Sequence, residues 1–266
     1  MYYQIRVKVA VVTGAAKPDS IGHEVALRLL REGMRVVVAD LYEEGFPALR
    51  QFLCVRTDVA DPASAQLTME KAVEAFGRID CLVNCVGGSW GITRADLLAS
   101  PPLGFRGLTN CSLDDWRTIV AANLDSAFYC ARAAAPHLKK QGGAIVNVAS
   151  VAARKGIPPG AEGSSGPYAV AKAGVMGLTR QLALELGPFG VRVNCVAPGV
   201  VASGRLRRVM ALTGTEQGPE GPLASIPMQR IGTVEECAAL IVALCTDDTS
   251  YMTGVTVDAN GASYAA

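Results

Sequence analysis

The stretch Val7-Lys8-Val9-Ala10-Val11-Val12-Thr13-Gly14 begins the pattern that decides the fold. Residues 7–12 form a short, mostly apolar and β-branched run, which predicts a strand, and Thr13-Gly14 ends it. In residues 21–32, apolar side chains recur at positions 21, 25, 26, 29 and 30, the 3.6-residue period of an amphipathic helix. Gly33 is a typical residue at a helix end. We therefore expect a strand, a loop and a helix in succession.

The rest of the chain repeats this alternation. It predicts strands at residues 36–39, 52–55, 79–83, 144–148, 191–196 and 255–257, and helices at residues 62–76, 113–138, 168–186 and 234–244. The strands are apolar at both alternating positions, which is typical of a parallel sheet covered by helices. We predict an α/β fold, a Rossmann-like doubly wound parallel sheet of about seven strands with helices on both faces. Because no linker, repeat or composition break occurs, residues 1–266 are predicted to form a single domain.

Composition and charge exclude several classes of protein. Hydrophobic residues make up 50% of the chain and charged residues 18%, which argues against disorder. With 25 basic and 24 acidic side chains the net charge is +1, so no surplus charge is available to hold nucleic acid or an anionic membrane. Neither a signal-peptide pattern nor an apolar run of about 20 residues occurs. We expect a cytoplasmic protein with no nucleic-acid or membrane partner.

The eight cysteines are predicted to be reduced and structural. They are scattered, with no CxxC pair and no spacing typical of zinc sites. Several lie within apolar runs, as in Val193-Asn194-Cys195-Val196. We therefore expect buried thiols that act as small hydrophobic side chains, and no metal site.

The loop Thr13-Gly14-Ala15-Ala16-Lys17-Pro18-Asp19-Ser20-Ile21-Gly22 has the composition of a phosphate-binding loop. Small residues before a helix leave backbone N–H groups to face a pyrophosphate, and the helix dipole favours the anion. The loop departs from G-x-G-x-x-G, so alone it fits a plain tight turn equally well. The second strand, however, ends at Asp40, close to the spacing at which a carboxylate meets the adenine ribose hydroxyls. Together the two features predict a dinucleotide site.

Asp40 favours NAD over NADP, because a carboxylate there would repel a 2′-phosphate. Lys17 is a cation that could attract the same phosphate. We give more weight to Asp40, because its strand fixes its position, whereas Lys17 lies in a loop of uncertain course. A solvated aspartate at a strand end is the alternative interpretation.

Tyr168-Ala169-Val170-Ala171-Lys172 lies at the start of a predicted helix, where a separation of four places both side chains on one face. A free tyrosine is a poor base at neutral pH, but a neighbouring ammonium favours its phenolate form. The Y-x-x-x-K spacing alone is common by chance. Ser150 follows the fifth strand and so lies at the same edge of the sheet, where its hydroxyl could hold the substrate oxygen that Tyr168 protonates or deprotonates.

A longer series of residues carries a family resemblance. The series comprises Thr13-Gly14, Asp58-Val59, Asn84-Cys85-Val86-Gly87, Asn123, Ser150, Tyr168 with Lys172, and Pro198-Gly199. In order and spacing it resembles the commonest branch of the short-chain dehydrogenase/reductase family over nearly the whole chain. The resemblance implies a nicotinamide-dependent oxidoreductase of alcohols and ketones. It also implies self-association, usually as a homotetramer.

The resemblance further implies a role for each position. The implied catalytic set is Asn123, Ser150, Tyr168 and Lys172. Lys172 would also bind the nicotinamide ribose, and Asn123 would hold a water that relays protons to it. Asp58 and Val59 would contact the adenine, Asn84 and Gly87 would shape the wall beside the cofactor, and the loop after the sixth strand would seat the carboxamide. The expected cofactor contacts are Gly14, Ser20, Ile21, Asp40, Asp58, Val59, Asn84, Gly87, Tyr168, Lys172, Pro198, Gly199, Val201 and Ser203.

Several departures from the family pattern bear on function. The phosphate loop is two residues longer than Thr-Gly-x-x-x-Gly-x-Gly, and Ser20 stands where its middle glycine belongs. This Ser-Ile ending resembles the loop of bacterial enoyl reductases. Those enzymes space the tyrosine and lysine more widely, and residue 165, where their tyrosine would fall, is serine. Reduction of a carbon–carbon double bond is therefore the weaker interpretation. Cys85, which replaces the usual asparagine, is interpreted as a buried structural residue.

Two connections, residues 88–112 and 151–167, are enlarged and should project over the carboxyl edge, where substrates are selected. Residues 204–222 are a candidate lid. Its Arg205, Arg207 and Arg208 are interpreted as solvated helical residues rather than as ligands of an acidic substrate. His23 and His137 receive no catalytic role.

Three functions follow in order of preference. The first is an NAD-dependent dehydrogenase of a secondary alcohol, cyclic alcohols included. The second is a 3-oxoacyl carrier-protein reductase that uses NADPH, against which the Asp40 carboxylate argues. The third is a non-catalytic nucleotide sensor or scaffold, which would have no need of all four residues of the catalytic set.

Overall fold

The structure is a computed structural model, and it describes residues 7–89, 107–158, 165–204, 206–207 and 225–265. Within them, seven strands form one parallel sheet in the order β3-β2-β1-β4-β5-β6-β7. The strands are β1 (Val9–Thr13), β2 (Arg35–Asp40), β3 (Leu53–Arg56), β4 (Cys81–Asn84), β5 (Gly143–Val148), β6 (Val191–Pro198) and β7 (Thr256–Ala259). The strand order reverses between β1 and β4, which confirms the predicted doubly wound α/β fold.

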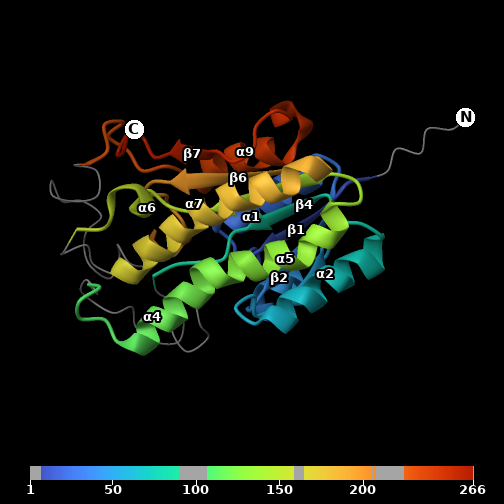
Figure 1. Cartoon of the computed structure of the whole chain (residues 1–266), viewed down its shortest axis with the longest axis horizontal. Helices are drawn as coiled ribbons and strands as arrows, with labels where there is room; N and C mark the ends of the chain where they lie inside the picture. The colour runs from blue at the N-terminus through green and yellow to red at the C-terminus, as the bar shows by residue number, and fades with distance from the viewer. Residues whose placement is uncertain (1–6, 90–106, 159–164, 205, 208–224, 266) are drawn as a thin grey trace, which may run out of the picture.

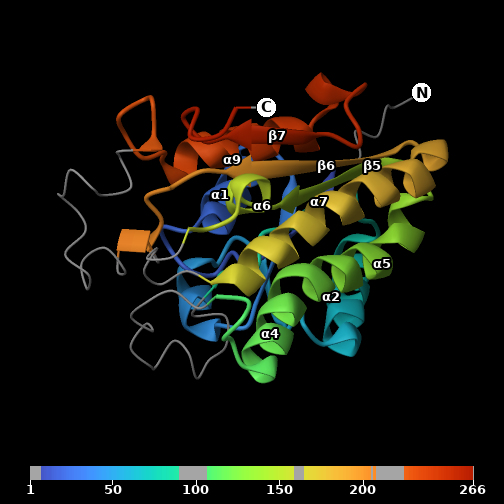
Figure 2. The same ribbon diagram turned by 60° about the vertical axis from the view of Figure 1, so that its left-hand side comes forward.

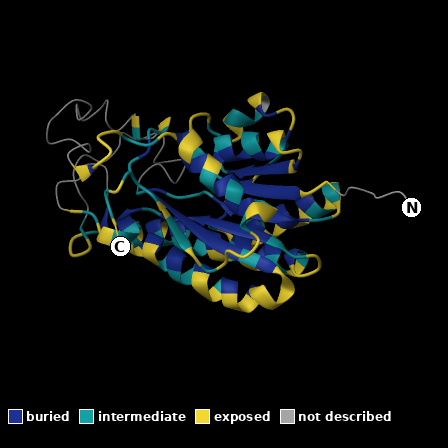
Figure 3. Ribbon diagram, turned by 90° about the horizontal axis from the view of Figure 1, so that it is seen from above, coloured by how far each residue is buried: buried dark blue, intermediate teal, exposed yellow. Residues whose placement is uncertain are grey.

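Helices cover both faces of the sheet (Figures 1 and 2). One face carries α1 (Ile21–Arg31) and α9 (Val234–Cys245), which pack against each other. The other face carries α2 (Pro62–Phe76), α5 (Ser126–Leu138) and α7 (Gly166–Leu186). The strands between these layers are largely buried (Figure 3). The sheet therefore separates two large hydrophobic cores, one on each of its faces.

Alternation along each strand divides its side chains between the two cores. In β1, Val12 packs toward α1 and α9, whereas Val11 packs toward α2, α5 and α7. Both are 0% exposed, as are Val37 and Val38 in the neighbouring strand. Complete burial of a side chain of this size stabilises the fold by about 1.5–3 kcal/mol, so these strands have no face left for solvent.

Local capping explains why the helices begin and end where they do. Asp61 accepts hydrogen bonds from the amides of Ala63 and Ser64 at the start of α2, Pro62 occupies its first turn, and Gly77 ends it in a left-handed conformation. The predicted helix at residues 62–76 is confirmed at both ends. Ser20 caps α1 by accepting from His23 N. The other predicted elements are confirmed within about two residues at each end.

The long predicted helix at residues 113–138 contains an interruption that was not predicted. It comprises α4 (Leu113–Val120), a π-helical segment η2 (Ala121–Asp125) and α5. Asn123 Nδ2 donates to the carbonyl of Ile119 at 2.8 Å, the carbonyl that residue 123's own amide would use in a regular α-helix. Its side chain therefore supports the widened turn, and such π segments are frequent at functional sites.

A short helix after β5, α6 (Ala152–Lys155), was also not predicted. Most of the enlarged connection at residues 88–112 lies outside the described residues, which omit 90–106, whereas the connection at 151–167 lacks only 159–164. Most of the candidate lid is also outside them, since 205 and 208–224 are omitted. No helix in the described part of the chain is long and apolar enough to cross a membrane.

Candidate active site at the carboxyl edge of the sheet

The phosphate loop is held tightly between β1, β4 and α1. Gly14 has φ +69° and donates its amide to Ala39 O at 2.8 Å. A side chain on Gly22 would overlap the carbonyl of Gly14, so the first turn of α1 lies directly against the loop. Thr13 Oγ1 accepts from the amide of Cys85 at 3.2 Å, which ties the loop to the end of β4. These contacts place Gly14, Ser20 and Ile21 together at the open start of α1.

Asp40 ends β2 with its carboxylate against the phosphate loop. The residue is 7% exposed, Oδ2 accepts from Ala16 N at 2.9 Å, and Oδ1 accepts from Tyr42 N at 3.1 Å. Burial raises the pKa of the Asp40 carboxyl above its ordinary value, whereas these two hydrogen bonds and the charge of Lys17 act in the opposite direction. Lys17 Nζ lies 4.0 Å from the centroid of the Tyr42 ring, so the loop lysine is positioned by a cation–π contact beside Asp40.

Asp58 and Val59 follow β3 at the same edge. Asp58 is exposed and its Oδ1 accepts from Ala60 N at 3.0 Å, which shapes the turn before α2. Val59 is 5% exposed and packs into the core on the α2 side of the sheet. The two residues therefore present one polar and one apolar group next to β2.

Lys172 is buried beneath Tyr168. It is 3% exposed, and its Nζ donates to Val148 O at 2.8 Å and to Val86 O at 3.4 Å. The same Nζ lies 5.9 Å from the centroid of the Tyr168 ring, and Tyr168 itself is half-buried. Carbonyl groups at the ends of β4 and β5 thus hold a cation on the same side of α7 as the phenol.

Gly87 lies where only a glycine fits, between Asn123 and Lys172. A side chain there would overlap Asn123 Oδ1 and lie 2.6 Å from Lys172 Nζ, and φ is +150°. Asn123 is 1% exposed, and its side chain accepts from Gly88 N at 2.8 Å and donates to Gly88 O at 2.9 Å. The turn after β4, the π segment and α7 therefore meet at one point.

Ser150 lies between β5 and α6. Its Oγ accepts from the amide of Ala152 at 3.1 Å, which leaves the hydroxyl hydrogen for another acceptor. The loop after β6 approaches the same edge. Gly199 packs so closely against Asn260 that a Cβ would lie 2.7 Å from its Cα, and Val201 pairs with Gly232.

The loop after β6 also reaches the phosphate loop. Pro198 is buried at the end of β6, and Ser203 Oγ accepts from Leu206 N at 3.4 Å. Gly204 N donates to Asp19 O at 3.0 Å, so the phosphate loop contacts this segment. Arg207 is exposed, as predicted for a solvated residue, whereas Arg205 and Arg208 lie outside the described residues.

Comparison with known proteins agrees with this arrangement. A family model described as "Enoyl-(Acyl carrier protein) reductase" matches residues 14–261, which includes the whole edge described above. A relative from Escherichia coli K12, 3-oxoacyl-[acyl-carrier-protein] reductase FabG, is 33% identical over 97% of this chain and 97% of its own length. The chain belongs to the short-chain dehydrogenase/reductase family.

Two further relatives show how varied its similar proteins are. The short-chain reductase protein NovJ of Streptomyces niveus is 38% identical over 95% of this chain and 92% of its own length. The ligand-free aldohexose dehydrogenase AldT of Thermoplasma acidophilum has a TM-score of 0.79 and 26% identity, over 96% of this chain and 93% of its own. The chain is therefore an oxidoreductase of a family that uses NAD(P), acts on small molecules and typically forms homo-oligomers.

In this family member, a buried polar ladder that the sequence analysis missed extends behind the site. Asn84 Nδ2 donates to Asn147 Oδ1 at 2.9 Å, and Asn147 Nδ2 donates to Thr179 Oγ1 at 2.9 Å. Asn84 therefore turns its side chain into the interior, toward β5 and α7. An asparagine in the middle of the apolar run Ile145-Val146-Asn147-Val148 was the available signal, because buried amides need partners.

The thiols of this oxidoreductase are all free, and Cys81, Cys130, Cys195, Cys237 and Cys245 are buried. This confirms the structural interpretation for those five. Cys85 is half-buried and packs against the core, and burial raises the pKa of its thiol to about 12, so it is protonated at neutral pH. In the described part of the chain, no group of three or more His, Cys, Asp or Glu side chains is arranged to hold a metal ion.

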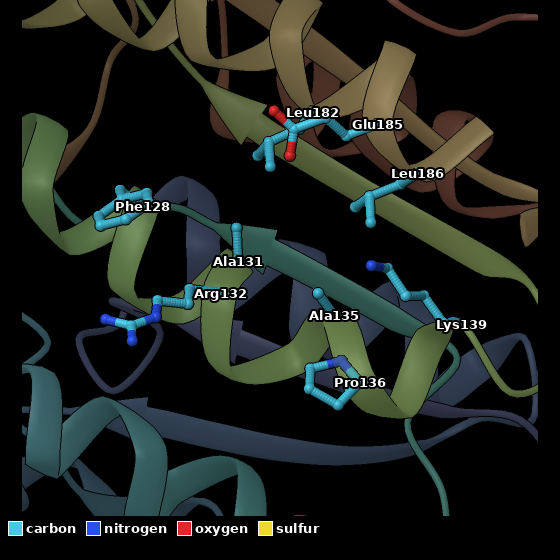
Figure 4. Close-up of a pocket in the computed structure, with 9 residues that line it drawn as sticks. All are labelled: Phe128, Ala131, Arg132, Ala135, Pro136, Lys139, Leu182, Glu185 and Leu186. Carbon is cyan, nitrogen blue, oxygen red and sulfur yellow. The ribbon is translucent and has the colours of Figure 1, made fainter. Parts of the chain in front are cut away.

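A groove on the outer surface lies away from this site, between α5 and α7 (Figure 4). Phe128, Pro136 and Leu182 are among its apolar lining residues, and Arg132, Lys139 and Glu185 are its charged ones. It is therefore not part of the carboxyl edge.

Proposed function

We propose that this oxidoreductase interconverts a secondary alcohol, cyclic alcohols included, and its ketone with NAD(H), and that Tyr168 is the general acid and base. The observation that carries the proposal is the buried Lys172 ammonium beside Tyr168. Its Nζ is bound to Val148 O at 2.8 Å and lies 5.9 Å from the phenol ring centroid. Holding a cation in this way costs desolvation, and a cation close to a phenol favours the phenolate form that accepts a proton.

The residues at the carboxyl edge fit a dinucleotide. The first turn of α1, which lies against Gly14, offers the backbone amides of Ile21 and Gly22 to a pyrophosphate, and Asp40 offers lone pairs to ribose hydroxyls. The absence of a side chain at Gly87 lets the turn after β4 lie directly against Asn123 and Lys172. When bound there, the nicotinamide supplies hydride transfer.

The chain's own residues would orient the substrate and move its proton. Ser150 would donate its hydroxyl hydrogen to the substrate oxygen, and Tyr168 would exchange a proton with the same oxygen. The side chain of Asn123 is already engaged by Gly88 and Ile119, so we propose that it positions the turn beside Lys172 and that its own carbonyl, in the π segment, holds the relay water. We also propose that the other residues expected at the cofactor contact it as the family resemblance implies. They are Asp58, Val59, Asn84, Gly87, Pro198, Gly199, Val201 and Ser203.

Asp40 supports NAD as the preferred cofactor. Its carboxylate is fixed by two backbone amides at the end of β2, where a 2′-phosphate would meet it. Lys17 lies nearby over the Tyr42 ring and partly offsets the carboxylate's charge. The deciding measurement compares turnover with NAD(H) and NADP(H). A strong preference for NADPH would overturn this part of the proposal.

The substrate class is tested with a panel of alcohols and ketones assayed with NAD and NADH. The panel includes cyclic and aromatic diols, hydroxy acids, aldohexoses and 3-oxoacyl thioesters. We expect turnover of a secondary alcohol, and turnover of 3-oxoacyl thioesters alone would favour the second candidate instead.

That second candidate, a 3-oxoacyl carrier-protein reductase, is supported by the relative FabG. Reduction of a carbon–carbon double bond, the reaction in the matched family's description, is less well supported. The wider tyrosine–lysine spacing typical of enoyl reductases is absent, because Ser165 stands at the position of their tyrosine.

We also propose that residues 1–266 act as one domain, that the protein is cytoplasmic, and that it assembles as a homotetramer. The groove between α5 and α7 supports self-association. Phe128, which lines it, is 42% exposed, and surface apolar groups of this kind favour burial against another chain.

A further inference from the structure

His23, in the first turn of α1, contacts the phosphate loop. Its Nδ1 lies 3.1 Å from Ala15 O. Because a carbonyl oxygen can only accept, Nδ1 carries the proton and donates. The imidazole is half-buried, and Ala15 is completely buried. This hydrogen bond therefore joins the helix that begins at Ser20 to the loop that precedes it.

The other end of the same peptide group is held by Asp40. The carbonyl of Ala15 and the amide of Ala16 belong to one peptide unit, and that amide donates to Asp40 Oδ2 at 2.9 Å. In a trans peptide the C=O and N–H bonds point in opposite directions. His23 on α1 and Asp40 on β2 thus hold one peptide group from its two sides.

The two hydrogen bonds reinforce each other. A donor at the Ala15 carbonyl draws electron density along the peptide, which makes the Ala16 N–H a stronger donor to the carboxylate. The two hydrogen bonds run in one direction, from the imidazole N–H of His23 through the Ala15–Ala16 peptide to the negative carboxylate of Asp40. Rotation of this peptide would break both bonds at once.

The adjoining peptide is confined as well. A side chain at Gly45, in the 3-10 helix η1 (Glu43–Ala48), would overlap the carbonyl of Ala16. The loop therefore has one orientation available between α1, β2 and η1. A loop with two additional residues has more conformations to lose on binding, so such restraint lowers the entropy cost of binding.

We propose that His23 is a positioning residue for the dinucleotide. Together with Asp40 it fixes the Ala15–Ala16 peptide, so that the Asp40 carboxylate and the amides of Ile21 and Gly22 at the start of α1 face one ligand. This inference rests on the proposed nucleotide site. It assigns a role to a histidine that takes no part in the proton chemistry.

The test compares binding of NAD⁺ and of ADP-ribose by calorimetry in the wild-type chain, His23→Phe and His23→Asn. ADP-ribose lacks the nicotinamide, so its binding reports on the phosphate loop without turnover. Phenylalanine keeps a ring but has no donor, whereas the asparagine Nδ2 can occupy the place of the imidazole Nδ1. His23→Leu replaces His23→Phe if thermal unfolding shows that the phenylalanine variant does not fold.

We expect Kd for both ligands to rise by about three- to tenfold in His23→Phe, the equivalent of one lost hydrogen bond, and to recover in His23→Asn. The Michaelis constant for the cofactor should rise in parallel, while kcat at saturating cofactor stays near the wild-type value. Equal binding by wild type and His23→Phe, or failure of His23→Asn to recover, overturns the positioning role alone. Absence of dinucleotide binding by the wild type overturns the proposed function and this inference together.

Discussion

At the scale of the residue, Tyr168 and Lys172 differ from an ordinary surface pair in the surroundings of the lysine. An exposed pair four residues apart on a helix contributes only a few tenths of a kcal/mol and has no fixed geometry. Here the carbonyl of Val148 in β5 and that of Val86 just after β4 bind Lys172 Nζ, and Gly87 packs closely against it. The ammonium is therefore fixed relative to the phenol before any ligand binds.

Replacing Tyr168 with phenylalanine should remove turnover and keep cofactor binding. General acid–base catalysis typically contributes about 10²–10⁴-fold, so we expect kcat to fall by at least about 10²-fold while Kd for NAD⁺ changes little. Steady-state kinetics and calorimetry on Tyr168→Phe provide the measurement. Tyr251→Phe, at a completely exposed tyrosine, is the matched control. Normal turnover by Tyr168→Phe would exclude Tyr168 from the chemistry.

Single residues were the part of the site that the sequence predicted least completely. Tyr168, Lys172 and Ser150 could be found because spacing and strand ends identify them. The partners of Asn147 could not, because its pairing with Asn84 depends on the register of β4 against β5. The contact of His23 with Ala15 likewise depends on how the loop folds back on α1.

At the scale of the element, η1 packs against the phosphate loop at Gly45. Because a methyl group there would overlap the Ala16 carbonyl, Gly45→Ala should lower the free energy of unfolding by about 1–3 kcal/mol, the usual cost of overpacking. Gly177 lies in α7 with open space around it. Gly177→Ala should therefore raise the free energy of unfolding by about 0.5–1 kcal/mol, because alanine is the better helix former. Urea unfolding of both variants checks the pair. An unchanged free energy of unfolding in Gly45→Ala would show that η1 can move away from the phosphate loop.

The N-terminus of α9 predicts a pH dependence. Thr233 and Glu236 form a capping box, and Arg230 binds the Glu236 carboxylate. The Arg230 hydrogen bond lowers the pKa of Glu236 from 4.5 to about 2. A carboxyl with a lowered pKa in the folded state stabilises the protein above its unfolded pKa and loses that effect as the pH falls.

We therefore expect Glu236→Gln to have a lower melting temperature than wild type at pH 6, and the difference to shrink as the pH falls from about 4.5 toward 2. Melting temperatures of both proteins across this range provide the measurement. Glu74→Gln, an exposed carboxylate within α2, serves as the control variant. A difference that stays constant with pH would exclude the ionised pair as its cause.

At the scale of the whole molecule, alternation of strands and helices was enough to predict the sheet and its two helix layers. Most strands are apolar at both alternating positions over most of their length, a pattern typical of a sheet covered on both faces. The interruption at η2 was not predictable, because its cause is Asn123 reaching the Ile119 carbonyl while it also holds Gly88. Periodicity describes a helix but not what its side chains bind.

The proposed tetramer predicts an effect of the groove between α5 and α7 on assembly. Phe128→Lys replaces an exposed apolar lining residue of the groove with a charge and should shift the protein to a smaller species in sedimentation or sizing experiments. Leu67→Lys, at a 49% exposed leucine on α2, is the control and should leave the mass unchanged. If the wild type is already monomeric, self-association is excluded. A full-size Phe128→Lys assembly would locate the interface elsewhere.

The hydrogen bond from Gly204 to the carbonyl of Asp19 has a consequence for anyone who exchanges parts between relatives. Asp19 has φ +58°, and it belongs to a loop that is two residues longer than the family pattern. A chimera that receives a loop of ordinary length loses the acceptor for Gly204, although the graft itself is complete. The two segments, remote in sequence, should therefore be transplanted as a pair.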